Sequence, residues 1–460
     1  MMTLEDYLRS DARLYPDKTA VICGDERVTY GELWSRVENC ARQIVAEIGS
    51  PSQMGKKLMP FRSVCEIDTL VRYFAIHLAG GIAVPLEKDL PETQYQSYAQ
   101  LDSDHLPEDI ADVLFTTGTT GKKKGVLISN ATIIADAENL VAAQGYHHDL
   151  TFIICGPLNH IGSLSKVYPM ILVGGTIHLL DGIKDIEAWY RAMESPQHHY
   201  ASFLVPDSLR MLMTFSADKL SQYGDRIEFI ETGAAPMAQA DMERLCQLLP
   251  QSRLYNTYAS TETGIIATHD FNHGGCLAGC LGKPMRHSEI IIISDDDRVA
   301  YPSVYDAKEK GAGRVACKGK TLMSGYMDDE ALTSSVCRDG IVYTADLGWI
   351  DEEGRLRLEG RADDVINVGG YKVVPTEVED AALTLPMVQD CVCIPVQHRV
   401  LGTVLKLLVV LADGAVWDKR AIARGLQQHL ENYQIPMQYE QVENIHRTFN
   451  GKIDRKAYLS

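Results

Sequence analysis

A hairpin between two apolar runs reads Leu114-Phe115-Thr116-Thr117-Gly118-Thr119-Thr120-Gly121-Lys122-Lys123-Lys124-Gly125. Glycines let consecutive backbone N–H groups point into one concavity, threonine hydroxyls add donors and lysine adds positive charge, as a polyphosphate requires. The segment is not a Walker loop, because it leads into a second strand, 126–128, and not into a helix. A flexible polar hairpin tip is the alternative reading. The density of these residue types between two strands favours phosphate binding.

The sequence on both sides of this hairpin alternates between strand and helix patterns. Apolar residues at three- and four-residue steps predict a helix over 33–48, and two more helices are expected over 131–144 and 237–249. Asn130 and Gly145 fit the start and stop of the second one. Short β-rich runs lie between them, at 19–23, 81–86, 112–116, 125–128 and 228–230. Such alternation is typical of a layered α/β architecture.

The character of the chain changes after Gly313. Four short strands are predicted at 314–317, 340–344, 347–350 and 355–358, with a turn at 351–354. Beyond a charged stretch, a helix is expected from the capping-box spacing of Thr376 and Glu379. Strands at 388–395 and 404–411 and a helix over 418–433 follow. The sequence thus predicts an α/β protein with a large N-terminal layered α/β domain (1–360) containing a β-rich subdomain, a hinge (361–364) and a small α+β C-terminal domain (365–460).

Length and charge narrow the function classes. A chain of 460 residues exceeds what one hydrophobic core usually supports. Its formal net charge of −18 speaks against nucleic acid or an anionic membrane as the main partner. No apolar run is long enough for a membrane span, and the N-terminus lacks the pattern of a signal peptide. Eleven scattered cysteines are read as reduced thiols of a cytoplasmic protein.

Three further segments carry groups that suit a nucleotide. Tyr258 could stack on a base, and Thr261 and Glu262 could serve a phosphate oxygen and Mg²⁺. Asp346 at a strand end, with Arg361 nearby, suits ribose hydroxyls. Taken singly, these residues fit an ordinary strand end and surface charges, and the lysine-rich segment near residue 452 fits a loosely ordered basic tail.

In this order the segments resemble the adenylate-forming superfamily, which includes acyl-CoA synthetases, aryl-CoA ligases, peptide-synthetase adenylation domains and luciferases. The resemblance spans nearly the whole chain, from 15–21, 29–33 and 78–85 to 451–455. It implies that ATP and Mg²⁺ serve to convert a carboxylic acid to an acyl-adenylate. The acyl group then passes to the thiol of CoA or of a carrier protein's phosphopantetheine. Positioning and positive charge are what such phosphoryl chemistry demands.

The resemblance also implies a role for each matching residue. The β- and γ-phosphates would be held by Thr116, Thr117, Gly118, Thr119, Thr120, Gly121 and Lys124. Thr261 would contact the α-phosphate, Glu262 the Mg²⁺ and Lys452 both the acyl carboxylate and the α-phosphate. The adenosine would be held by Tyr258, Asn256, Gly233, Ala234, Ala235, Asp346 and Arg361. The C-terminal domain would be mobile about Asp363, with Gly369 and Gly370 lining a pantetheine tunnel after it swings.

The segment around His160 bears on the acid. Amino-acid-activating members carry an Asp where this chain has Asn159-His160, and an unpaired buried ammonium would be costly. This argues against an α-amino acid, and the resemblance assigns the acyl pocket to His160, Thr232, Gly233 and Ala259. The methyl group of Ala259 favours a compact aromatic or a short-to-medium aliphatic acid.

Three functions remain open from the sequence. The leading interpretation is an acyl- or aryl-CoA ligase (AMP-forming). A stand-alone acid–acyl-carrier-protein ligase shares the first half-reaction, and a non-catalytic nucleotide-binding homologue is the third hypothesis. The chain departs from the family pattern at four positions near the site, which are Lys123, Ala259, Ala345 and Asn367.

Overall fold

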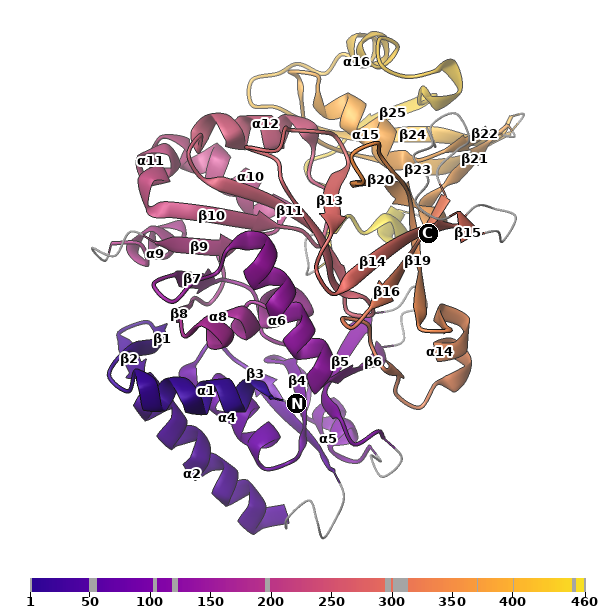
Figure 1. Ribbon diagram of the computed structural model, residues 1–460. Coiled ribbons are helices and arrows are strands. Elements are labelled where there is room, and N and C mark those ends of the chain that lie inside the picture. Colours follow the sequence, from indigo (N-terminus) through magenta and orange to yellow (C-terminus); the bar gives the residue numbers. More distant parts are fainter. Residues whose placement is uncertain are drawn as a thin grey trace.

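The computed structural model describes residues 2–48, 56–101, 106–117, 123–194, 199–293, 299–300, 313–369, 371–399, 401–448 and 452–458. Figure 1 shows a large N-terminal part, with the C-terminal module (residues 366–458) lying beside α12 and β20. The mixed α/β architecture follows the sequence prediction. Within the described residues, no helix is long and apolar enough to cross a membrane.

A long mixed sheet runs through the N-terminal part. Its strand order is β15 (Val299–Ala300), β14 (Ser288–Ile293), β16 (Gly313–Gly319), β19 (Ile341–Ile350), β20 (Leu356–Arg361), β13 (Cys280–Pro284), β12 (Gly264–Asp270), β11 (Arg253–Ser260), β10 (Ile227–Thr232), β9 (Tyr200–Phe203), β7 (Thr151–Ile154), β8 (Thr176–Leu179), β1 (Thr19–Cys23) and β2 (Glu26–Thr29), with β18 (Cys337–Arg338) beside β19. Strands β8, β7, β9, β10 and β11 are parallel, so their carboxyl ends share one edge.

A second sheet has the order β17 (Gly325–Tyr326), β6 (Lys123–Ser129), β5 (Ile110–Thr117), β4 (Ile82–Glu87) and β3 (Leu58–Ser63). Helices fill the space around the two sheets. They are α1 (Leu4–Leu14), α2 (Tyr30–Ile48), α4 (Ile67–Leu78), α5 (Glu92–Ala99), α6 (Asn130–Gln144), α7 (Ile161–Leu164), α8 (Val167–Val173), α9 (Ile186–Arg191), α10 (Pro206–Phe215), α11 (Ala217–Gln222), α12 (Gln239–Leu248) and α14 (Glu330–Val336), with a 3₁₀ turn η1 (Gly224–Arg226). The main apolar cluster joins both sheets to α1, α4, α6 and α8, and further clusters lie beside it.

The C-terminal module has a core of its own. It contains η2 (Ala362–Asp364) at its entrance, β21 (Ile366–Val368), β22 (Tyr371–Val373), α15 (Pro375–Leu383), β23 (Val388–His398), β24 (Gly402–Leu411), α16 (Lys419–Leu426), η3 (Asn432–Gln434), β25 (Gln438–Gln441) and η4 (Arg455–Tyr458). Among the strands described, β21 to β25 pair only with one another. The apolar cluster under them draws all its members from this module.

Several local predictions need correction. Helix α6 is capped by Ser129, whose hydroxyl accepts from the Thr132 amide, and Asn130 is already helical. The capping box at Thr376 was wrong, because Pro375 begins the helix and the Thr376 hydroxyl donates to the carbonyl of Glu359. The segments 340–344 and 347–350 form one strand, β19. The last helix ends at Leu426, and the chain turns back so that Gln434 donates to Glu377 on α15.

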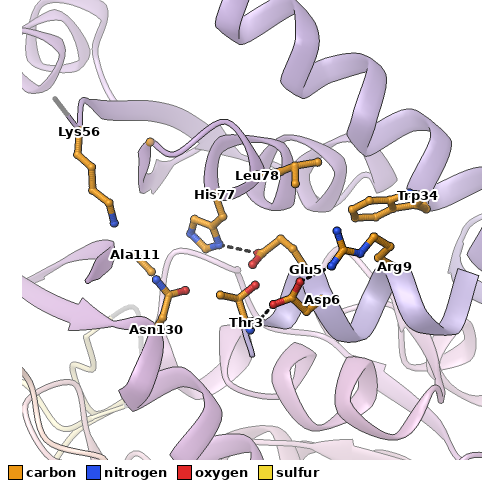
Figure 2. Close-up of a pocket in the computed structure, with 11 residues that line it drawn as sticks. Thr3, Glu5, Asp6, Arg9, Trp34, Lys56, His77, Leu78, Ala111 and Asn130 are labelled. Atoms are coloured by element: carbon orange, nitrogen blue, oxygen red, sulfur yellow. Dashed lines mark hydrogen bonds and ion pairs between the residues drawn. The ribbon is translucent and has the colours of Figure 1, made fainter. Parts of the chain in front are cut away.

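A buried charge cluster ties α1 to α4 and β5. The His77 ring lies 2.9 Å from Glu5 on one side and 2.9 Å from Asp112 on the other, and Tyr73 also donates to Asp112. Burial alone would lower the pKa of His77, but the two carboxylates raise it to about 10. Figure 2 shows His77 and Glu5 beside a cavity of about 150 Å³, which also contains Arg9 and Lys56 in its lining.

We expect His77→Gln to lower the free energy of unfolding by about 3 to 5 kcal/mol, because it leaves two buried carboxylates without their cation. The folded pKa of about 10 lies above the unfolded value, so this stabilisation is complete below about pH 6.5 and is lost as pH rises through 10. Urea unfolding at pH 6 and pH 10 measures both effects. His429→Gln, on an exposed residue after α16, is the control, and an equal effect of both variants would contradict the prediction.

Candidate active site

The carboxyl ends of β10 and β11 position the central residues. These strands are parallel neighbours, and Thr232 pairs with Asn256 at their ends. Strand β11 continues through Tyr258 and Ala259 into a tight turn that carries Thr261 and Glu262 before β12 returns antiparallel. Ligand sites of parallel sheets usually lie at this edge of the strands. The turn therefore presents the hydroxyl of Thr261 and the carboxylate of Glu262, which the resemblance assigns to a phosphate and to a metal.

The residues assigned to ribose and adenine are in contact. Tyr258 is almost buried, and its hydroxyl donates to Asp346 Oδ2 at 2.6 Å. Burial and the Asp346 charge raise the pKa of Tyr258 well above its usual range, which keeps the phenol protonated as a donor. Asp346 and Arg361 are register partners on β19 and β20, with their side chains 3.6 Å apart. Tyr258, Asp346 and Arg361 thus form one polar surface from strands that are far apart in sequence, and we call it the nucleotide platform.

The segment Gly233-Ala234-Ala235 lies against this platform. A Cβ on Gly233 would lie 2.8 Å from the carbonyl oxygen of Thr257, a contact too close for any side chain. Ala234 follows with a φ of 67°, in the left-handed region that non-glycine residues seldom adopt. The sharp turn that these two residues make keeps the backbone close to the end of β11. Asn256, also buried, contacts the carbonyl of Cys280 at 3.5 Å.

The phosphate hairpin is formed by β5 and β6, where Thr116 pairs with Lys124 and Thr117 with Lys123. Its tip, with Gly118, Thr119, Thr120 and Gly121, lies outside the described residues. Lys124 Nζ lies 5.5 Å from the Tyr326 ring centre, and the Tyr326 hydroxyl donates to Glu262 at 2.9 Å. Tyr326 was not predicted, because nothing in its spacing connects it with Glu262. It lies on β17, which pairs with β6.

Lys123 has a defined partner. Its ammonium lies 2.6 and 2.7 Å from the two carboxylate oxygens of Glu87 at the end of β4. In this chain an ion pair anchors the base of the hairpin to the neighbouring strand. Glu87 also lies near His160, whose pKa it tends to raise.

Lys452 reaches this site from the C-terminal module. Arg447 and Ile453 form a β-bridge, and the Thr448 amide donates to the carbonyl of Lys452 at 2.7 Å. Although Lys452 keeps some exposed surface, burial of its ammonium and the charge of Arg361 lower its pKa. The carboxylates of Asp346 and Glu262 act in the opposite direction. The ammonium therefore lies within electrostatic range of the nucleotide platform and of the turn after β11.

Of the residues assigned to the acyl pocket, His160 is within electrostatic range of Lys452. His160 precedes α7, and burial lowers its pKa, with Lys123 and Lys452 adding to the effect. A neutral imidazole is therefore favoured at neutral pH. Thr232 is buried, and its hydroxyl has no hydrogen-bond partner in the described part of the chain. Ala259 packs against the main apolar core.

A buried ion pair lies close to Thr232, because Glu231 precedes it on β10. Lys166 donates to Glu231 at 2.7 Å, and each side chain is 1% exposed. The Lys166 ammonium is 5.1 Å from the ring centre of Phe203, and this ring would be 3.2 Å from a Cβ on Gly162 and 3.8 Å from one on Gly233. The sequence analysis missed Lys166 and Glu231, because each is an ordinary residue within an apolar segment.

The remaining site predictions lie apart from this centre. Asp363 is exposed in η2, 3.6 Å from Arg361. Gly369 is exposed at the turn between β21 and β22 with a φ of 59°, which favours glycine, and Gly370 lies outside the described residues. The structure thus displays the hairpin-turn role of Gly369.

Glu262 is the carboxylate available for a metal beside the phosphate hairpin. A different group, His147, His199 and Glu228, could also hold an ion, since its ligand atoms lie within 4.8 Å of one another. These residues lie at the amino ends of β7, β9 and β10, and Thr232 lies at the carboxyl end of β10. The second group is therefore separate from the site assembled around Glu262, and Arg253 already neutralises Glu228.

Comparison with known proteins shows to which family the chain is related. Residues 97–327 match the AMP-binding enzyme family, and residues 377–452 match the AMP-binding enzyme C-terminal domain. The chain belongs to the AMP-binding enzyme family. The predicted membership of the adenylate-forming superfamily is thereby confirmed.

The relatives of this AMP-binding enzyme are CoA ligases. A 2-succinylbenzoate–CoA ligase of Staphylococcus epidermidis is 24% identical to this chain, and the match covers 99% of this chain and 97% of that enzyme. A long-chain-fatty-acid–CoA ligase of Salmonella typhimurium is 28% identical over 76% of this chain and 61% of that enzyme. The structure of o-succinylbenzoate CoA synthetase from Bacillus subtilis, in complex with its acyl-adenylate intermediate, has a TM-score of 0.82 at 22% identity, covering 99% of this chain and 98% of the other.

We expect Gly233→Ala to weaken AMP binding by about tenfold or more, because the new methyl group must push the segment away from the Thr257 carbonyl. Ala234→Gly is the matched control, since glycine accepts the φ of 67° without strain. Calorimetric titration with AMP measures the affinity, and thermal unfolding shows whether each variant is folded. Equal affinities of the two variants would contradict this account.

Proposed function

We propose that this AMP-binding enzyme is an AMP-forming acid–thiol ligase that acts on a small carboxylic acid and ATP, with CoA as acceptor. The observation that carries the proposal is the position of the Lys452 ammonium, which the fold brings within electrostatic range of Glu262, Asp346 and Arg361. An ammonium there can neutralise both anionic reactants of acid activation. The names of the curated relatives support the same reaction class.

In the first half-reaction, an oxygen of the acid carboxylate forms a bond to the α-phosphorus of ATP. The bond from that phosphorus to the bridging oxygen breaks, and pyrophosphate leaves. Lys452 holds the carboxylate next to the α-phosphate and offsets the charge on the oxygens, while Thr261 donates to the α-phosphate. Thr116, Thr117 and Lys124, with the hairpin tip, hold the leaving pyrophosphate. Tyr258, Asp346 and Arg361 fix the nucleoside.

Glu262 suits Mg²⁺, because it offers hard carboxylate oxygens at the turn that faces the phosphate hairpin. Tyr326 binds one of these oxygens and orients the carboxylate. When bound, the ion would withdraw charge from the phosphate oxygens.

The second half-reaction exchanges AMP for a thiol. The acceptor loses its proton to solvent, its sulfur bonds to the acyl carbon, and the bond from that carbon to the AMP oxygen breaks. We assign residues 361–364 as the hinge between the domains 1–360 and 365–460, with Asp363 as its pivot. Rotation there would remove Lys452 and carry Gly369 and Gly370 to the site, where the absence of side chains leaves room for a pantetheine arm.

For the acid, the pocket residues support a compact aromatic or short-to-medium aliphatic substrate. The methyl group of Ala259 takes up space in this group of residues, and the buried Lys166–Glu231 pair lies beside Phe203. The thiol state of all eleven cysteines supports a reducing compartment such as the cytoplasm as the place of work.

A screen for acid-dependent pyrophosphate release tests the whole proposal, with compact aromatic, short aliphatic and long-chain acids as three arms. Each active acid is then offered with CoA or with a phosphopantetheinyl carrier protein. Thioester formation with CoA supports the proposal, and transfer to the carrier alone would identify the carrier-protein ligase instead. If no acid releases pyrophosphate, the protein is a non-catalytic homologue and the proposal fails.

We expect Lys452→Ala to reduce pyrophosphate release by about a hundredfold or more, because a preorganised charge on the reacting oxygens is lost. Thioester formation from a supplied acyl-adenylate should change little, since Lys452 has left the site in that step. Lys419→Ala on the surface of α16 is the control for the loss of a lysine. Equal impairment of the two half-reactions would argue against separate poses of the C-terminal module.

A further inference from the structure

Five charged residues meet where the C-terminal module touches α10 and α12. We call them the interface cluster; its members are Asp207, Arg210, Asp241, Asp390 and Arg447. The Nη2 atom of Arg447 lies 2.9 Å from each carboxylate oxygen of Asp390 on β23, within its own module. Its Nε lies 3.2 Å from Asp207 Oδ2 on α10, across the interface. Arg447 therefore contacts a carboxylate in each of the two parts.

Arg210 completes the cluster from the other side. It contacts Asp241 on α12 at 2.8 Å and Asp207 at 3.5 Å, and it approaches Asp390 across the interface at 3.9 Å. The side chains of Arg447, Asp207 and Asp390 are 21%, 30% and 18% exposed, so they are better shielded than an ordinary surface pair. Burial raises the pKa of Asp207, and the two arginines act against this shift. On α15, burial and the charges of nearby carboxylates, Asp241 among them, raise the pKa of Asp380 to about 7.

Arg447 is directly coupled to the residue that reaches the active site. It forms the β-bridge with Ile453, and the next residue, Thr448, exchanges backbone and hydroxyl hydrogen bonds with Lys452. The described residues 447–448 and 452–453 are thus paired with each other, with Arg447 in contact with α10, and we call these four residues the Lys452 hairpin. A change in the position of Arg447 moves the Lys452 backbone.

The contacts within the cluster also allow the two parts of the protein to separate. If the two parts separate, Arg447 keeps Asp390, and Arg210 keeps Asp241 and Asp207. Each guanidinium retains a carboxylate, so that only the cross-contacts to Asp207 and Asp390 are lost. A buried pair with no replacement partner would instead make separation very costly.

We propose that Asp207 and Arg447 are positioning residues, whose ion pair holds the Lys452 hairpin at the site during acid activation and breaks before thioester formation. This inference rests on the proposed function, because it assigns the pair to one half-reaction only. Neither residue contacts the reacting atoms.

The test compares Asp207→Asn with the wild type in both half-reactions. Pyrophosphate release should fall by about tenfold, the size expected for a hydrogen bond to a charged group, with the loss in kcat and not in the KM for ATP. Thioester formation from a supplied acyl-adenylate should stay within about twofold. Asp207→Glu keeps the charge and should recover most of the activity, and Asp225→Asn on the exposed η1 should behave as the wild type.

Hydrogen exchange supplies a readout that needs no catalysis. The Thr448 amide, which donates to Lys452, should exchange faster in Asp207→Asn, with thermal unfolding unchanged. Equal losses in both half-reactions, a lowered melting temperature, or wild-type activity and exchange would each overturn the proposal. If the wild type releases no pyrophosphate with any acid, the proposed function fails, and the exchange experiment still decides whether the ion pair holds the hairpin.

Discussion

The rest of the structure depends on one constraint, which is that the Lys452 ammonium must reach the residues assigned to the anionic reactants. The Lys452 ammonium comes from the end of the chain, and the groups around it come from β11, β19 and β20. Asp346 and Glu262 favour its charged form, while burial and Arg361 oppose it. Its position requires the C-terminal module to rest against α10 and α12. The catalytic site is therefore a property of the domain arrangement as much as of any one element.

Much of this arrangement was accessible from the sequence. The apolar periodicity predicted α2, and the β-rich runs predicted β1, β4, β5, β6 and β10, whereas β7, β8, β9 and β11 were not predicted. The order of motifs gave the family, and the structure brings Tyr258, Asp346 and Arg361 into contact as the motifs required. Helix starts were less predictable. At Ser129 the cap is one hydrogen bond, which a neighbouring polar residue could equally have supplied. At Pro375 the start of the helix is determined by the geometry of the proline ring.

Other residues could not have been found by pattern. Tyr326 reaches Glu262 only because β17 pairs with β6. Lys166 and Glu231 form their bond across 65 positions of sequence, and neither belongs to a motif. The partners of Arg447 are distributed over α10 and β23. In all three cases the information is carried by tertiary packing, and a single sequence gives no measure of which charges will meet.

The imidazolium between Glu5 and Asp112 has a consequence for how related sequences can diverge. Replacement of His77 alone would leave two carboxylates in the core without their cation, whereas replacement of Glu5 or Asp112 alone leaves one buried ion pair. The acids must therefore become neutral before the histidine can be lost. Homologues without the histidine should have neutral residues at both acidic positions, and a histidine-free pair of acids should be rare.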